Sequence, residues 1–338
     1  MPIIHSDEPL LENSDAGLRC RIGGFHIDPG RPMERAVITH AHADHARPGC
    51  GGYLATPECA HLLRARLGSD IRVQELPYGA SLSLNGLRLS LHPSGHILGS
   101  AQVRLERGGE IWVITGDFKR HPDPTCAPFE PLRCHTLVTE STFGLPVFRW
   151  PEAETVMAEV RDWWRRNAGQ GKTSILFAYA LGKAQLVIAG VGTANGPVFT
   201  HPAVEQMARI YREAGVQLPP TRAVETTAGR EDLAGALVIA PPGAEGSGWM
   251  GRFARRSLAF ASGWMQIRGN RRRRALDRGF VLSDHADWPA LLQTVAESRA
   301  ERIWTTHGYA DEVTRFLREK GLAAEALRGN RAAREADA

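Results

Sequence analysis

The segment from Thr39 to His45 reads Thr-His-Ala-His-Ala-Asp-His and concentrates metal-ligand side chains directly after a short apolar stretch. Alternate residues that leave a strand share a face, so we expect His40 and His42 to face one ion. Asp44 and His45 then turn toward a second ion. Three imidazoles and a carboxylate are ligands that suit zinc. The segment therefore predicts half of a two-metal site rather than a histidine-rich surface loop.

Two further ligand residues follow apolar stretches that read as strands. His96 ends a Ser-Gly-His sequence after residues 87–91, and Asp117 ends a Thr-Gly-Asp sequence after residues 111–114. Loops held by a rigid scaffold are where catalytic groups gather. We expect both side chains to complete the site begun by the histidine segment.

The same arrangement recurs far downstream. His285 ends a Ser-Asp-His sequence after residues 280–282, and His307 stands in Thr-His-Gly after residues 303–304. With these two, six of the thirteen histidines are accounted for.

In their order, these residues resemble the metallo-β-lactamase superfamily, and Glu140 in Thr-Glu-Ser-Thr, with His285 and His307, resembles motifs A, B and C of its β-CASP branch. That branch contains nucleases, including the cleavage subunit of mRNA 3′-end processing, ribonuclease J and Artemis. A chain this short, with so abbreviated a middle region, most resembles the bacterial DNA ligase-associated exonucleases. The superfamily motif is carried by His40, His42, Asp44, His45, His96 and Asp117.

The resemblance implies a role for each residue. His40, His42 and His96 hold one zinc ion, Asp44, His45 and His307 hold the other, and Asp117 bridges the two, with manganese as a possible replacement. Asp28 matches a residue that braces the histidine segment without touching metal. A water between two cations becomes a nucleophile near neutral pH, with Asp44 and Asp117 as its metal-holding carboxylates. His285 is the candidate general acid, oriented by Glu140, although a purely supporting role for His285 stays open.

The expected fold class is α/β, with the αββα sandwich that the resemblance implies and an inserted, shortened β-CASP domain. We assign residues 1–145 and 275–338 to the sandwich and residues 146–274 to the insert. The pattern of apolar residues, prolines and glycines predicts individual elements. The expected helices span 57–67, 151–166 and 202–214, a hairpin spans 82–91, and strands span 173–177, 197–200 and 236–240.

The distribution of charge and the composition indicate which partner and which compartment to expect. Nine arginines lie between Arg252 and Arg278, which suits phosphate neutralisation, although a solvated loop is the open alternative. Helix N-termini near Lys183 and Ser247 are further candidates for phosphate contacts. The candidate nucleic-acid contacts are Arg268, Arg271, Arg272, Arg273, Arg274, Lys183 and Ser247.

The chain lacks a signal-peptide pattern and a membrane span, so we expect a cytoplasmic protein. The five cysteines indicate no disulfide framework.

These observations favour a zinc-dependent DNA exonuclease of DNA repair that works beside a ligase and a helicase. RNA is the second candidate substrate, because a histidine at motif C resembles the RNA-acting members of the branch. A small-molecule hydrolase of the superfamily stays open but would not need Glu140, His285 or the insert. A binding module without activity would be expected to have lost ligands, and this chain keeps them.

Overall fold

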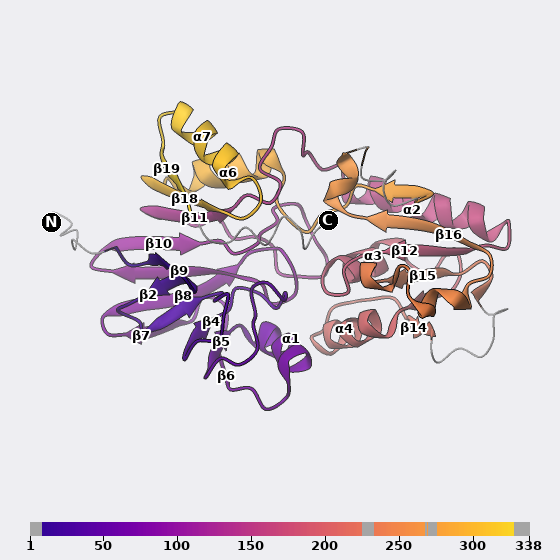
Figure 1. Cartoon of the computed structure of the whole chain (residues 1–338), viewed down its shortest axis with the longest axis horizontal. Helices are drawn as coiled ribbons and strands as arrows, with labels where there is room; N and C mark the ends of the chain where they lie inside the picture. The colour runs from indigo at the N-terminus through magenta and orange to yellow at the C-terminus, as the bar shows by residue number, and fades with distance from the viewer. Residues whose placement is uncertain (1–8, 225–232, 268, 270–275, 328–338) are drawn as a thin grey trace. The chain divides into compact units, whose positions relative to one another are not determined.

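The computed structural model describes residues 9–224, 233–267, 269 and 276–327. The chain forms two compact units (Figure 1), unit 1 from Met1–Phe148 with His285–Ala338, and unit 2 from Arg149–Asp284. Arg268 and Arg271 to Arg274 lie outside the described residues.

Unit 1 contains two sheets. The first has six strands in the order β1-β2-β3-β4-β5-β6, in which β1, β2 and β3 pair antiparallel and the later neighbours pair parallel. Helix α1 (Pro57–Leu67) follows β5, with Thr56 accepting a hydrogen bond from the Cys59 N–H as its N-cap. The strands are β1 (Glu12–Ser14), β2 (Gly17–Cys20), β3 (Phe25–Ile27), β4 (Ala36–Val37), β5 (Tyr53–Ala55) and β6 (Val73–Glu75).

The second sheet of unit 1 has seven strands in the order β19-β18-β11-β10-β9-β8-β7. Strands β7 to β10 form an antiparallel meander, and β10, β11, β18 and β19 pair parallel. The strands are β7 (Ser81–Leu84), β8 (Leu87–Pro93), β9 (Ala101–Arg107), β10 (Glu110–Ile114), β11 (Thr136–Glu140), β18 (Arg302–Thr306) and β19 (Ala323–Ala326).

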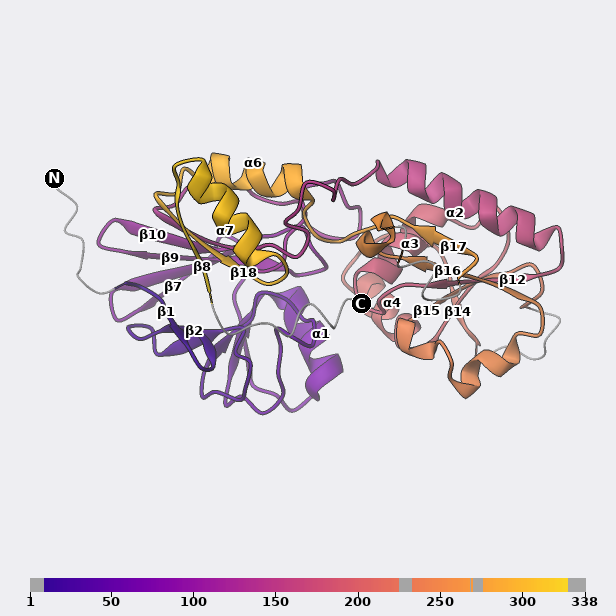
Figure 2. The same ribbon diagram turned by 45° about the horizontal axis from the view of Figure 1, so that its top comes forward.

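The two sheets bury one apolar core between them. Val37 and Leu54 from the first sheet lie in one buried cluster with Leu89, Leu91 and Val103 from the second. Helices α6 (Trp288–Ser298) and α7 (Ala310–Glu319) cover the other face of the second sheet, while α1 lies on the opposite side of unit 1 (Figure 2). The layers are therefore helix, sheet, sheet and helix, and the predicted α/β sandwich is confirmed.

Unit 2 has one six-stranded sheet in the order β14-β13-β15-β12-β16-β17, and each of its described pairings is parallel. Helix α2 (Ala153–Ala168) precedes β12, whereas α3 (Lys183–Val191) connects β12 to β13 and α4 (Pro202–Glu213) connects β13 to β14, the crossover connections that parallel strands need. The strands are β12 (Thr173–Phe177), β13 (Val198–Thr200), β14 (Arg222–Ala223), β15 (Leu237–Ala240), β16 (Arg256–Ala261) and β17 (Arg278–Phe280).

The structure moves several of the boundaries expected from sequence: unit 2 begins at Arg149 rather than at residue 146, and α2 ends at Ala168 rather than at residue 166. The chain stays in unit 2 through Asp284 rather than leaving at residue 275, because β17 adds to the sheet of unit 2 beside β16. Helix α2 begins at Ala153 rather than at Pro151, because Glu152 has an extended backbone.

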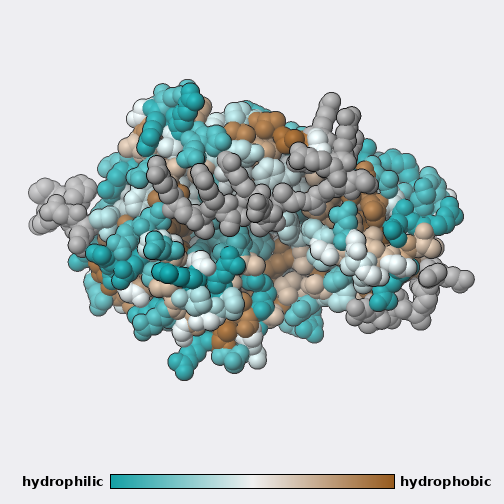
Figure 3. Space-filling view, viewed as in Figure 1, coloured by the Kyte–Doolittle hydropathy of each residue, from teal (hydrophilic) through white to brown (hydrophobic). Residues whose placement is uncertain are grey.

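The described surface is largely polar. Large exposed apolar side chains are confined, among the described residues, to Val147 and Leu322, and hydrophilic residues predominate on the face in Figure 3. Across the same residues, no helix has both the length and the apolar character needed to cross a membrane. The five cysteines are free thiols.

Candidate metal centre

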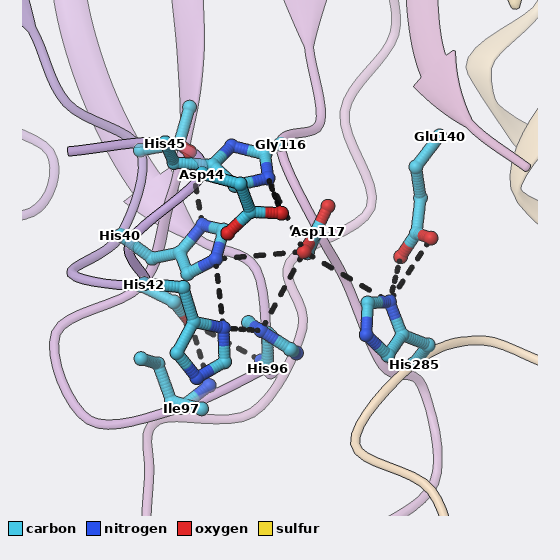
Figure 4. A network of polar contacts seen from close by, with 12 residues as sticks. His40, His42, Asp44, His45, His96, Ile97, Gly116, Asp117, Glu140 and His285 are labelled. Atoms are coloured by element: carbon cyan, nitrogen blue, oxygen red, sulfur yellow. Dashed lines mark hydrogen bonds and ion pairs between the residues drawn. The ribbon is translucent and has the colours of Figure 1, made fainter. Parts of the chain in front are cut away.

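The histidine segment follows β4 and is fixed from both sides. The Ile38 N–H donates to the Leu54 carbonyl on β5, and Arg66 of α1 donates to the Ala41 carbonyl. The Ala46 N–H then donates to the His42 carbonyl, which closes a turn. These bonds direct the imidazoles of the segment inward, where the contact network of Figure 4 begins.

The first ligand set consists of His40, His42, His96 and Asp117, whose donor atoms all lie within 4.8 Å of one another. His42 Nδ1 is 3.1 Å from His40 Nε2 and 3.1 Å from His96 Nε2. Asp117 Oδ2 is 3.4 Å from His40 Nε2 and 3.8 Å from His96 Nε2. His40, His96 and Asp117 are buried, so these donors face one another rather than solvent. Such a set can hold a cation.

Two glycines allow the loops of this set to approach closely. A Cβ atom on Gly95 would lie 2.2 Å from the Lys119 carbonyl oxygen, and one on Gly116 would lie 2.6 Å from the Thr39 side chain. Both glycines have positive φ angles, of 74° and 55°. The backbone next to His96 and Asp117 is therefore set by close packing that excludes any side chain.

The second ligand set consists of Asp44, His45 and His307. His45 Nε2 lies 3.7 Å from Asp44 Oδ2 and 3.4 Å from Asp117 Oδ2, and the His45 and His307 rings stack with centroids 5.2 Å apart. These donors do not gather as closely as the first set in the described part of the chain. His45 Nε2 is buried without a hydrogen-bond partner, which fits an atom reserved for a metal ion.

Asp28 braces the second set. Its carboxylate accepts hydrogen bonds from the Thr39 N–H at 2.8 Å and the Thr39 hydroxyl at 2.5 Å, and lies 2.8 Å from His45 Nδ1. This contact directs His45 Nε2 toward Asp117. Asp28 has a φ angle of 43°, which a non-glycine residue adopts only when its surroundings hold it.

The loop that carries His307 is held by a residue to which sequence reasoning gave no role. The Ser141 hydroxyl lies 2.8 Å from the Thr306 carbonyl oxygen and 2.7 Å from that of His307, and the Tyr309 N–H donates to the Ser141 carbonyl. His307 has a φ angle of 58°, and a Cβ atom on Gly308 would lie 2.4 Å from the Thr142 Cα. The position of Ser141, directly after Glu140 in motif A, was the only signal for this function.

Glu140 and His285 form a buried pair beside Asp117. His285 Nδ1 lies 3.0 Å from both carboxylate oxygens of Glu140 and 4.0 Å from Asp117 Oδ2 (Figure 4). The Glu140 carboxylate also accepts hydrogen bonds from the Phe118 N–H at 2.9 Å and the Thr142 N–H at 3.3 Å. The Glu140 carboxylate therefore fixes the orientation of the His285 ring through Nδ1.

The ionisation of these groups follows from burial and mutual charge. Burial raises the pKa of Glu140, but attraction to His285 and hydrogen bonds outweigh it and hold this pKa at about 2. Burial raises the pKa of Asp117 to about 8. Burial lowers the pKa of His45, yet Asp117, Asp44 and Asp28 raise it to about 10. The carboxylates thus favour positive charge at His45, and a metal ion would supply it.

The two described candidates for nucleic-acid contact have other partners. Lys183 is buried, with its Nζ 3.1 Å from Asp284 Oδ1 and 4.6 Å from the centre of the Tyr179 ring. Ser247 donates its hydroxyl hydrogen bond to the Ala244 carbonyl and precedes η4 (Gly248–Arg252), a short 3-10 helix. A buried ammonium paired with a carboxylate does not suit a phosphate contact, so we assign Lys183 a structural role.

Comparison with known proteins gives several relatives, although no family model matches the chain. A probable DNA ligase of Opitutus terrae is 33% identical over 307 residues, which are 90% of this chain and 30% of that protein. Endoribonuclease YSH1 of Saccharomyces cerevisiae is 26% identical over 33% of this chain and 19% of its own length. Transcription termination factor FttA of Pyrococcus abyssi is 29% identical over 53% of this chain and 34% of its own length. The chain thus spans about a third or less of these relatives.

A solved structure supports the fold alone. A protein of unknown function from Enterococcus faecalis V583 superposes with a TM-score of 0.59 over 82% of this chain and 76% of that chain, at 11% identity. Together with the ordered ligand residues and the relatives, this fold confirms the resemblance found in the sequence. The chain belongs to the β-CASP branch of the metallo-β-lactamase superfamily, whose nucleases depend on metal ions.

Proposed function

We propose that the chain is a dinuclear zinc phosphodiesterase that removes nucleotides from a DNA end. The observation that carries this proposal is the buried Glu140–His285 pair, with His285 Nδ1 4.0 Å from Asp117 Oδ2. A metal-binding cluster alone would serve many hydrolases. A histidine beside it, oriented by its own carboxylate, suits a reaction whose leaving oxygen needs a proton.

The spacing of the first ligand set supports zinc. Four ligands at about 2.0–2.1 Å from a tetrahedral ion lie about 3.3–3.4 Å apart. Four of the six donor pairs are close to this spacing, from 3.1 Å between His42 and His40 to 3.8 Å between His96 and Asp117, and all six lie within 4.8 Å. We propose that a second ion is held by Asp44, His45 and His307, with Asp117 shared. Manganese suits the same imidazole and carboxylate donors.

Glu140, His285 and Asp117 then have separate roles in the reaction. Bound metal ions lower the pKa of a water and offset negative charge on phosphate oxygens. Glu140, ionised because its pKa is about 2, accepts the Nδ1–H of His285 and fixes the orientation of the ring. His285 donates a proton from Nε2 to the leaving oxygen of the strand. Asp117 holds the two ligand sets together, since its Oδ2 faces imidazoles from both.

The choice of DNA rests on the relative named a probable DNA ligase, which matches 90% of this chain. We propose that the chain acts in DNA repair beside a ligase, with a helicase as a further partner. RNA is the second candidate, because two other relatives are named an endoribonuclease and a transcription termination factor. The arginines between Arg252 and Arg278 would bind the strand, and those at 268 and 271–274 lie outside the described residues.

Digestion of end-labelled DNA and RNA of matched sequence, single- and double-stranded, tests the proposal. We expect stepwise shortening of DNA from one end in the presence of zinc or manganese, and loss of activity in Asp117→Asn. Internal cleavage of RNA with intact DNA would favour the second candidate. Absence of cleavage of every substrate, with two ions bound, would contradict a nuclease and favour a small-molecule hydrolase.

A further inference from the structure

A pocket of about 450 Å³ lies within unit 1, on the side of the metal centre that carries Asp28. His45 and His307 of the second ligand set line it, together with Arg31 and Arg47. Its volume is in the range of pockets that hold small organic ligands. Its apolar lining consists of Leu18, Ile27, Ile114, Val138 and Leu327.

Arg47 lacks the partner that a partly buried guanidinium normally has. Its side chain forms no hydrogen bond and no ion pair with any described residue, and its Nε atom is buried without a partner. Leaving a buried donor unpaired opposes folding, so such groups are rare unless a ligand pairs them. Arg66 of α1, by contrast, is also partly buried and donates to the Ala41 carbonyl.

The carboxylates of the pocket have other partners. Asp28 receives its bonds from Thr39 and His45, and Glu140 from His285, Phe118 and Thr142. Asp15, which is exposed, forms no ion pair with Arg47 in the described structure. The pocket therefore combines an unpaired cation, two metal-ligating imidazoles and an apolar wall. Guanidinium groups bind phosphate oxygens strongly and with defined geometry.

We propose that Arg47 binds the strand phosphate next to the one that is cleaved, and that the pocket receives the nucleoside between these two phosphates. The apolar wall then contacts sugar and base without hydrogen-bonded readout, which suits cleavage independent of sequence. This inference rests on the proposed function, because it needs a nucleic-acid strand at the metal centre.

Thymidine dinucleotides test the inference without the many phosphates of a long strand. Three are compared: one with hydroxyls at both ends, one with a 5′-phosphate and one with a 3′-phosphate. We expect the parent to prefer one phosphorylated dinucleotide by ~10- to 150-fold in kcat/KM, the scale of a hydrogen bond to a charged group. Arg47→Ala should remove that preference mainly through KM, and Arg47→Lys should keep part of it. Arg88→Ala, at an exposed arginine of β8, should keep the ratio of the parent.

A binding measurement gives a second readout. By calorimetry, we expect metal-loaded parent protein to bind thymidine 3′,5′-bisphosphate at least ~10-fold more tightly than either thymidine monophosphate, because the metal centre takes one phosphate and Arg47 the other, and Arg47→Ala to lose this difference. A parent that degrades long DNA or RNA but shows no phosphate preference in either assay overturns the inference and leaves the nuclease standing. A parent that degrades neither polymer overturns the proposed function itself.

Discussion

The replacement Asp28→Asn tests how the second metal ion is held. Asparagine keeps the shape of the side chain and tolerates the φ angle of 43°. Its carbonyl oxygen can still accept the Thr39 N–H, so the amide group must take the place of Oδ2, beside His45 Nδ1. An amide N–H there donates to Nδ1 and places the imidazole proton on Nε2. That atom is the one that faces Asp117 at 3.4 Å and would bind the metal.

We therefore expect Asp28→Asn to weaken the second metal site more than the first. Loss of a residue that orients a ligand typically lowers metal affinity 10- to 100-fold, or about 1.4–2.8 kcal/mol. Asp28 reaches the first set only indirectly, because the Thr39 hydroxyl that donates to its Oδ2 lies 3.1 Å from His40 Nδ1. The affinity of the first set should therefore fall less than that of the second.

Titration of metal-free protein with zinc against a competing chelator measures both affinities. Asp70→Asn is the control, because Asp70 is an exposed aspartate in unit 1. Thermal unfolding of the metal-free variant separates a metal effect from a folding defect. If Asp28→Asn binds two ions as tightly as the parent, the bracing function assigned to Asp28 is wrong.

Three further outcomes are expected. His285→Ala should keep both ions but lose roughly 10²- to 10⁴-fold in rate on DNA, and much less on a nitrophenyl phosphodiester whose leaving group needs no proton; equal losses would exclude a general acid. Asp117→Asn should lower zinc content and activity more than loss of any other single ligand, as elemental analysis would show, because its carboxylate faces both ligand sets. The pKa of Glu140 is about 2 in the folded protein against an ordinary 4.5, so the free energy of unfolding of metal-free protein should fall as the pH is lowered from about 4.5 toward 2. Urea unfolding across this pH range measures the loss, and an equal loss in Glu140→Gln would contradict the prediction.

Sequence reasoning located the elements that have strong local signals. The helix predicted for 57–67 and the strand predicted for 173–177 match α1 and β12 because a proline start and a buried apolar run mark them. It also placed ligands after strands, and the structure gathers His40 and His42, which follow β4 of the first sheet, with His96 and Asp117, which follow β8 and β10 of the second.

Features that depend on distant contacts could not be predicted in this way. The positive φ angle of Asp28 follows from its bonds to Thr39 and His45, eleven and seventeen residues away. Ser141 reaches the His307 carbonyl across 166 residues. The unpaired state of Arg47 is a property of its surroundings, and an arginine in a sequence gives no sign of it.

The two ligand sets differ in what fixes their geometry. Gly95 and Gly116 set the first by backbone packing that leaves no room for a Cβ atom. The second depends on Asp28 and His307, two non-glycine residues with positive φ angles, which hydrogen bonds from Thr39, His45 and Ser141 hold in place. Close backbone packing deforms little, whereas a supporting hydrogen bond can be removed by a single substitution. The geometry of the second set is therefore the easier one to disturb. An unequal loss of the two ions in Asp28→Asn would show that the two sets are held in different ways.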